Sequence, residues 1–340
     1  MRCSPKLFAL TLICVLAARL TGHDTPVNPN DPLLALPNLP KPALFSAAHP
    51  PNDPTAGTAL SPSVRFVSGQ RVILDGVMQF DRGPADGLEV LACLSEGKTH
   101  EALIRLTGTD GAVIKGAVLA AFGSADGKPA GENSGIPARG VPMRLQIVWK
   151  DEDNTWHWVD AANLVRDRKT DHAFPNLPWI YTGSREMLLT ENGPDGKAVR
   201  RTRFMLDATK SVAVNYDEPD ALFASPFPCA VEDNRYEAYS ALCPPPQTAV
   251  HMVISPAEVV LELHLDASGA LTLAGTVCDD AALAAAISAA FGGKATPAHR
   301  AITVRVAPTM SDDVVVAARA HLLAIAKTAK VWAVPIFQPE

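Results

Sequence analysis

The sequence predicts an α+β protein: a mainly antiparallel β-sandwich or distorted barrel, followed by a small two-layer ββαβαβ domain. The chain has 340 residues, and a domain commonly contains about 150, so two folded domains are expected. Residues 63–256 contain short segments in which apolar and polar residues alternate, separated by turns rich in Gly, Pro and Asp, which is typical of antiparallel sheets. Residues 257–340 instead alternate strand-like with helix-like segments, a pattern typical of helices packed on one face of a sheet.

The elements of residues 63–256 follow from this alternation. β-Branched and aromatic residues with period-two spacing indicate strands at 64–67, 71–80, 88–94, 101–106, 143–150, 155–159, 179–182, 201–206, 212–216 and 250–254. One helix is expected at 112–122, where small apolar residues repeat and Gly123 provides the end. Residues 95–98 and 151–154 are polar turns, so we expect the strands on either side of each to form hairpins.

Residues 257–340 carry the second set of elements. Strands at 259–265 and 270–274 flank the turn at 266–269, and further strands are expected at 302–306 and 330–336. Asp279 is a capping residue before an alanine-rich helix that ends at residue 291, ahead of two glycines. A second helix is expected at 312–328.

The first 22 residues have the three parts of a secretory signal peptide. Arg2 and Lys6 precede an apolar segment, 7–18, and small residues follow between Ala17 and Gly22. The apolar segment is shorter than the ~20 residues that a membrane span requires. We therefore expect residues 1–22 to be removed on export, leaving a periplasmic or extracellular protein that is not an integral membrane protein.

Residues 23–62 are expected to be a proline-rich linker. They contain ten prolines, which cannot continue a helix or a central strand and favour an extended chain. An alternative is a strap that lies across the domain surface, because Leu33, Leu34, Leu36 and Leu39 are apolar enough to dock.

Charge and composition argue against one large class of functions. The net charge is −6 and 6% of the residues are aromatic, whereas nucleic-acid binders need a basic face and stacking aromatic side chains. One local basic cluster, Lys197, Arg200, Arg201 and Arg203, is interpreted as a solvated face rather than a phosphate site. We expect no nucleic-acid partner.

Cys93 and His100 are the candidate metal or redox pair. If residues 95–98 form the turn of a hairpin, Cys93 lies opposite His100 on one sheet face, with Cβ atoms about 5 Å apart. An imidazole can lower the pKa of a thiol for nucleophilic attack, and both groups bind soft metals. The alternative is structural, because cysteine is among the residue types most often buried. No spacing selects a third ligand, so the cofactor is left open.

Two further pairs of residues are candidates for a disulfide and for a ligand platform. Cys229 and Cys243 lie in proline-flanked irregular segments, and a bridge between them would close a loop of about 15 residues in an oxidising compartment. The alternative is two buried thiols. Trp156 and Trp158 alternate on one strand, which puts both indoles on one face and His157 on the other; they suit either a ligand platform or a core contribution.

The most specific motif is Leu88-Glu-Val-Leu-Ala-Cys-Leu, followed by Gly97-Lys-Thr-His-Glu-Ala-Leu and by a helix that ends in Leu119-Ala-Ala-Phe-Gly. Together with segments 141–149 and 180–184, it resembles the YdjY-like domain of exported bacterial proteins of the planctomycete type, over residues of about 64–256. The helix end is more degenerate than the leucine-rich end typical of that family. The resemblance implies an exported module with no established activity.

A second resemblance covers residues of about 257–337. It is carried by residues 260–274, the helix after Asp279, residues 301–308 and Lys330-Val-Trp-Ala-Val, which look like the periplasmic domain of ExbD/TolR proteins. The membrane helix with an acidic residue that defines that family is not found here, so no motor role is implied. What the resemblance implies is a fold, and contacts with peptidoglycan or with other envelope proteins.

These observations lead to three functional hypotheses. The first is an exported, non-catalytic binding or interaction module of the bacterial cell envelope, whose partner is an envelope protein or peptidoglycan. The alternatives are a metal or redox protein centred on Cys93 and His100, and a hydrolase that uses the Cys93 thiol. We favour the first, because no motif supplies an acid or an oxyanion partner for the thiol.

Overall fold

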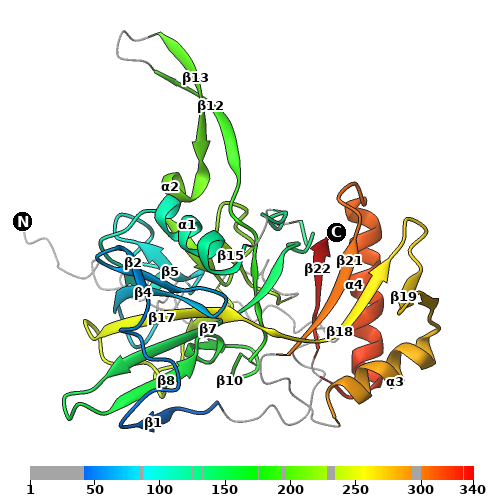
Figure 1. Cartoon of the computed structure of the whole chain (residues 1–340), viewed down its shortest axis with the longest axis horizontal. Coiled ribbons are helices and arrows are strands. Elements are labelled where there is room, and N and C mark those ends of the chain that lie inside the picture. Colours follow the sequence, from blue (N-terminus) through cyan, green and yellow to red (C-terminus); the bar gives the residue numbers. More distant parts are fainter. Residues whose placement is uncertain are drawn as a thin grey trace, which may run out of the picture.

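The structure is a computed structural model, and it describes residues 42–83, 87–123, 126–131, 134–174, 176–192, 197–227, 234–292, 300–331 and 333–340. Within these ranges the protein is mixed α/β and consists mostly of strands, with four α-helices (Figure 1). The predicted signal peptide, residues 1–22, lies outside the described residues. In the part of the chain that is described, no helix has both the length and the apolar character needed to cross a membrane.

Eight strands close into a barrel. Around it they are β7 (Val141–Lys150), β11 (Trp179–Tyr181), β15 (Phe223–Ala224), β14 (Ser211–Val214), β5 (Val90–Leu94), β6 (Ala102–Leu106), β4 (Arg71–Met78) and β17 (Ala249–Pro256). β17 pairs with both β4 and β7, which completes the ring. The barrel alternative is therefore correct; β5–β6 and β14–β15 are parallel, and the other six pairs are antiparallel.

Short strands extend the barrel sheet on two sides. β8 (Trp156–Asp160) and β1 (Phe45–Ala47) continue it beyond β7, while β3 (Val64–Val67) and β2 (Thr58–Ser61) continue it beyond β4. The prediction of a linker at 23–62 is therefore wrong for its described part, because β1 and β2 pair with the sheet. Its prolines at 50, 51 and 54 fall between these strands, where no ladder hydrogen bond is needed. The four leucines of the strap alternative lie outside the described residues.

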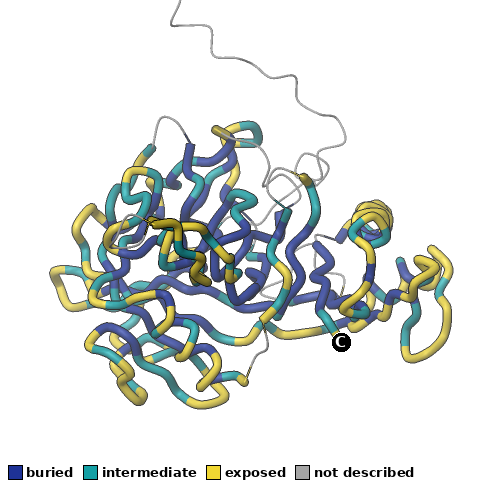
Figure 2. The backbone as a smooth tube through the Cα atoms, turned by 90° about the horizontal axis from the view of Figure 1, so that it is seen from above, coloured by how far each residue is buried: buried dark blue, intermediate teal, exposed yellow. Residues whose placement is uncertain are grey.

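The interior of the barrel is the main core of the protein. All eight strands contribute buried apolar residues to one cluster, and exposed residues gather in peripheral turns (Figure 2). α1 (Gly111–Phe122) packs against β3 and β4 and joins the same cluster. Its predicted end is confirmed, because Gly123 ends the helix with φ 63°. The helix starts one residue before the predicted 112, where the Asp110 carboxylate accepts a hydrogen bond from the Val113 N–H at 2.8 Å.

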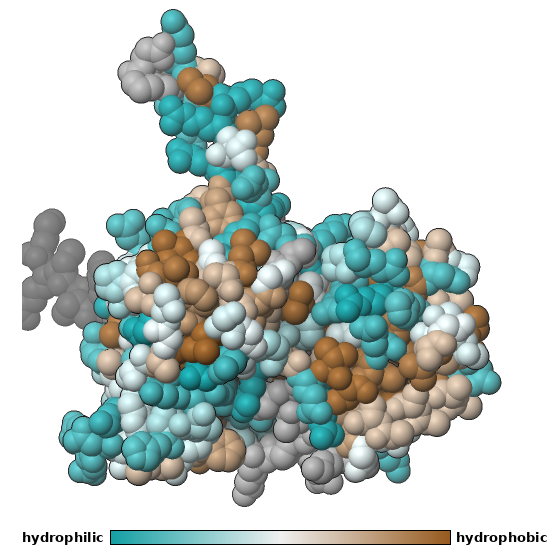
Figure 3. Space-filling model, in the orientation of Figure 1, coloured by the Kyte–Doolittle hydropathy of each residue, from teal (hydrophilic) through white to brown (hydrophobic). Residues whose placement is uncertain are grey.

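Two smaller sheets lie beside the barrel path. One joins β10 (His172–Ala173), β9 (Val165–Asp167) and β16 (Tyr236–Ala238), next to the short 3-10 turn Ala161–Leu164. The other is a hairpin of β12 (Glu186–Asn192) and β13 (Ala198–Phe204), which projects from the rest of the protein as an arm (Figures 1 and 3). α2 (Met205–Thr209) follows the arm, so the strand predicted at 201–206 ends earlier than expected.

The last part of the chain forms a five-stranded sheet. Its order is β20 (Thr276–Val277), β19 (Leu271–Leu273), β18 (Glu258–Leu265), β21 (Arg300–Val306) and β22 (Pro335–Pro339). β18, β21 and β22 are parallel, and α3 (Asp280–Ala290) and α4 (Asp312–Thr328) pack with the sheet around an apolar core of their own. The last strand begins at residue 335, later than the 330–336 predicted.

A buried arginine joins the barrel side of the chain to this sheet. Arg139, just before β7, donates to the Met310 carbonyl oxygen at 3.0 Å and forms an ion pair with Asp312 at the start of α4. The Lys128 Nζ lies 2.6 Å from the same Asp312 carboxylate. The next residue, Gly140, donates its N–H to β22. The start of α4 and the segment before it are thus held by Lys128 and Arg139.

Candidate functional site

The structure does not bring Cys93 and His100 together. β5 and β6 pair in parallel, with Val90 opposite Ala102 and Cys93 opposite Arg105, so the predicted hairpin is wrong. The connection between the strands returns the chain to the start of β5 before β6 begins. Cys93 is fully buried, whereas the His100 side chain is 76% exposed. Burial also raises the pKa of the Cys93 thiol to about 11, which is the opposite of activation.

His100 lies instead beside Glu101, next to a small cluster of charged side chains around Lys98. Its Nε2 is 3.1 Å from the Glu101 Oε1, and the neighbouring Lys98 Nζ is 3.3 Å from Glu89 and 3.8 Å from both Glu101 and Glu218. In the described ranges, no three His, Cys, Asp or Glu side chains are grouped so that they could hold a metal ion. The metal or redox site and the thiol hydrolase therefore lose the geometry on which they depended.

Trp156 and Trp158 share one face of β8, on the outside of the barrel. They pack on residues of β4, β7 and β17 that alternate with the core-facing ones, namely Ile73, Val148 and Val253. Phe45 of β1 stacks on Trp158 with ring centroids 5.7 Å apart, and the Lys150 Nζ lies 5.5 Å from the centre of the Trp156 ring. These neighbours leave both indoles half-buried, which is a packing role; a ligand platform stays a prediction.

The disulfide between Cys229 and Cys243 also stays a prediction, because Cys229 lies outside the described residues. The Cys243 thiol is half-buried, with its Sγ 3.8 Å from the Leu164 carbonyl oxygen. Burial raises the pKa of this thiol to about 12, so it is not poised for nucleophilic chemistry.

A serine, a histidine and an aspartate form one hydrogen-bonded chain at the edge of the barrel sheet. Ser46 of β1 lies opposite His157 of β8, and its Oγ is 2.7 Å from the His157 Nδ1. The other ring nitrogen, Nε2, is 2.7 Å from the Asp151 Oδ2, and Trp149 stacks on the imidazole. Hydrogen bonds from His157 and from the Thr155 N–H lower the pKa of Asp151, which keeps its carboxylate ionised. The sequence did not predict this hydrogen-bonded chain of side chains, because Ser46 lies in the predicted linker.

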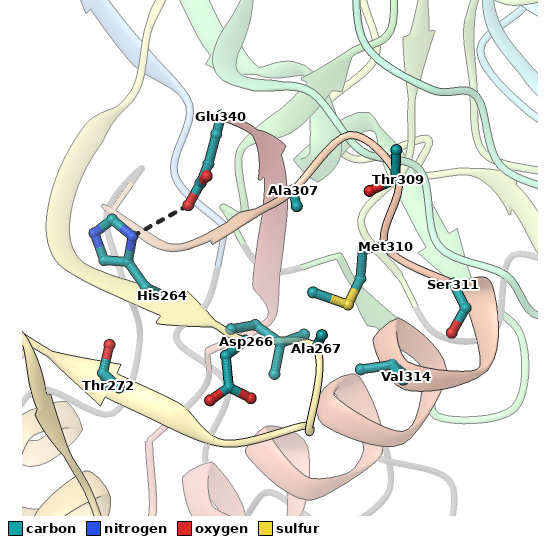
Figure 4. Close-up of a pocket in the computed structure, with 11 residues that line it drawn as sticks. His264, Asp266, Ala267, Thr272, Ala307, Thr309, Met310, Ser311, Val314 and Glu340 are labelled. Carbon is teal, nitrogen blue, oxygen red and sulfur yellow. Dashed lines mark ion pairs between the residues drawn. The ribbon is translucent and has the colours of Figure 1, made fainter.

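A cavity of about 450 Å³ lies at the carboxyl ends of β18 and β21 (Figure 4). Its walls come from the end of β18, the β18–β19 turn, the segment 307–311 and the first turn of α4. Ligands of open α/β sheets bind beyond the carboxyl ends of parallel strands, and small-molecule sites commonly measure about 300–1,000 Å³. Position and size therefore both fit a binding site.

The cavity has an apolar side and a polar side. Met310 points into it toward Ala267, and Val314 of α4 lies beside them (Figure 4). At the opposite side the His264 Nδ1 lies 3.6 Å from the Glu340 Oε1. Such a cavity suits a small amphiphilic group whose apolar part contacts Met310 and whose hydrogen-bonding or cationic part lies beside Glu340.

The segment that forms one wall of the cavity is fixed from the barrel side. Arg139 donates a hydrogen bond to the Met310 carbonyl oxygen and forms an ion pair with the Asp312 carboxylate, which ties the segment 307–311 to the barrel side of the chain. The sequence predicted β18, β21 and α4, and the carboxyl-end rule could have located the cavity from them. Nothing in the sequence pointed to Arg139.

Comparison of the chain with protein-family models, with curated proteins and with solved structures finds no match. The candidate site is therefore interpreted from its own geometry.

Proposed function

We propose that the protein is an exported binding module of the bacterial cell envelope, and that its cavity takes an amphiphilic group of peptidoglycan. The observation that carries the proposal is the cavity at the carboxyl ends of β18 and β21, with an apolar wall at Met310 and a carboxylate at Glu340. Peptidoglycan stem peptides offer methyl groups for the first and amino groups for the second. An envelope protein is the alternative partner.

The two sequence resemblances support the envelope location. Residues 64–256 resemble the YdjY-like domain of exported proteins, and residues 257–337 resemble the periplasmic ExbD/TolR domain. We also propose that residues 63–256 and 257–340 are two domains, the second with a two-layer ββαβαβ arrangement to which the short strand β20 is added. The separate apolar cores of the barrel and of the C-terminal sheet support this division.

Co-sedimentation with insoluble purified peptidoglycan tests the proposal. We expect the mature chain to sediment with it, and Val314→Trp, which fills the cavity, to remain in solution. Val316→Trp is the matched control, because Val316 lies on the same helix, is already 38% exposed and does not line the cavity. Equal sedimentation of the two variants, or none by the mature chain, would contradict the proposal.

The hydrogen-bonded chain of Ser46, His157 and Asp151 supports a second candidate activity, hydrolysis of an ester. The Ser46 Oγ would attack the ester carbonyl carbon while its proton passes to the His157 Nδ1, and Asp151 would stabilise the imidazolium through Nε2. The same proton would leave with the departing alcohol, and water would then release the acid from Ser46. Labelling of Ser46 by a fluorophosphonate, lost in Ser46→Ala and in His157→Gln, would support this activity; no labelling of the native chain would end it.

A further inference from the structure

The arm formed by β12 and β13 is a two-stranded sheet. Among the described strands, each of the two pairs only with the other, from Glu186 opposite Phe204 to Asn192 opposite Ala198. The arm extends away from the barrel (Figures 1 and 3). Its apolar residue Leu188 is 53% exposed. An isolated two-stranded hairpin is at best marginally stable in water, whereas three or more strands can be stable.

The outer edge of β13 is protected against further pairing. Three of its seven residues are Arg200, Arg201 and Arg203, and charged side chains on an edge strand oppose the addition of another strand. If β13 paired antiparallel with its own copy about its central residue, Arg201 would face Arg201. Arg203 is also engaged within the arm, with its Nε 2.6 Å from the Glu191 Oε1.

The outer edge of β12 has the opposite character. Its sequence, Glu186-Met-Leu-Leu-Thr-Glu-Asn192, has no basic residue and no proline. Antiparallel pairing of β12 with its own copy about Leu189 places Glu186 opposite Asn192, Met187 opposite Glu191 and Leu188 opposite Thr190. No like charges face each other in this register, and the uncharged residues meet at its centre.

We propose that the arm is a dimerisation element whose partner is a second copy of this chain. The two β12 strands pair antiparallel about a two-fold axis at Leu189, which makes a four-stranded sheet with the arginine-rich β13 strands on the outside. The contact is isologous, so it closes at two chains and does not propagate into a filament. The four strands together pass the minimum that a free-standing sheet requires.

Cysteine cross-linking tests the register directly, in a Cys278→Ser background. Leu189→Cys would place two thiols on the axis, with Cα atoms about 4.5–5.5 Å apart, which lies within the range for a disulfide. Thr202→Cys on β13 is the matched control, because three strand spacings, about 14 Å, would separate it from its copy. We expect a covalent dimer with Leu189→Cys and none with Thr202→Cys; equal cross-linking of both would overturn the proposal.

Sedimentation velocity tests the dimer without cross-links. The native chain should be dimeric, and Leu189→Lys should weaken dimerisation by at least about tenfold, because it sets two lysines opposite each other. Thr202→Lys on the outer strand should leave the dimer intact. Both variants should keep their fold, because the arm lies outside both cores. Circular dichroism checks this. A native chain that stays monomeric at its highest soluble concentration, or a dimer that survives Leu189→Lys, would overturn the proposal.

Discussion

Removal of Arg139 tests how the C-terminal sheet is held against the barrel. Its side chain is 3% exposed, whereas its ion-pair partner Asp312 is 33% exposed. Loss of one partner of a buried ion pair costs about 3–5 kcal/mol, because the other charge is left without its partner. Here Asp312 keeps Lys128 at 2.6 Å and some access to water, which favours the lower end of that range. We expect Arg139→Ala to lower the free energy of unfolding by about 3 kcal/mol.

The assay is urea unfolding followed by tryptophan fluorescence, with two comparison variants. Arg139→Met keeps most of the side-chain volume, so its difference from Arg139→Ala separates packing from charge. Lys128→Ala removes the exposed partner of the same carboxylate, and exposed pairs contribute about 0–1 kcal/mol. Equal losses for Arg139→Ala and Lys128→Ala would refute the reasoning, since burial would then have no energetic consequence.

The same contact has a defined pH dependence. The hydrogen bond from Lys128, with the charges of Lys128 and Arg139, outweighs the effect of burial and lowers the pKa of Asp312 from its ordinary 3.8. A lowered pKa in the folded state gives stability that is present above 3.8 and is lost as the pH falls through the folded value. The difference between the native chain and Arg139→Ala should therefore shrink on acidification below about pH 4.

Three further predictions address other parts of the barrel side. Burial raises the pKa of Asp217 to about 6, so the ionised carboxylate destabilises the folded chain at neutral pH. Asp217→Asn should therefore raise the free energy of unfolding by about 1–3 kcal/mol at neutral pH and leave it unchanged below about pH 4. Urea unfolding at both pH values measures the difference. Cys93 should resist iodoacetamide in the native chain and react in urea, as peptide mass mapping would show; rapid native labelling would mean that β5 opens. A Cβ at Gly140 would lie 1.9 Å from the Tyr181 carbonyl oxygen, so Gly140→Ala should lower the melting temperature, whereas Gly116→Ala, at an open helical position, should raise it slightly.

Local sequence signals located α1, α3 and α4, although not the short α2, because the causes of these helices are local. α1 begins at the carboxylate of Asp110 and ends at Gly123, and both features lie next to the apolar repeat in the sequence. The segment predicted at 312–328 has the same bounds as α4. The strand order is different, because it depends on partners that lie far apart in the chain.

The error at Cys93 shows why strand pairing was not predictable. The turn at 95–98 indicates that the chain reverses, but it does not say which strand lies beside β5. In the structure β5 lies between β6 and β14, with Ser211 opposite Cys93. Closure of the barrel likewise depends on β17, which pairs with both β4 and β7 although it lies far from them in the sequence. An alternation of apolar and polar residues determines which face of a strand is buried, but it does not determine which strand lies beside it.

The candidate cavity depends on the same kind of distant contact. Arg139 does not line it, yet its hydrogen bond to the Met310 carbonyl oxygen fixes the residue whose side chain does. If the C-terminal sheet alone shaped the cavity, ligand binding would be unchanged by Arg139→Met. If the barrel shapes it through this hydrogen bond, the same substitution should weaken peptidoglycan binding while the chain remains folded. The barrel would then contribute to recognition as a support that sets the position of Met310, without touching the ligand.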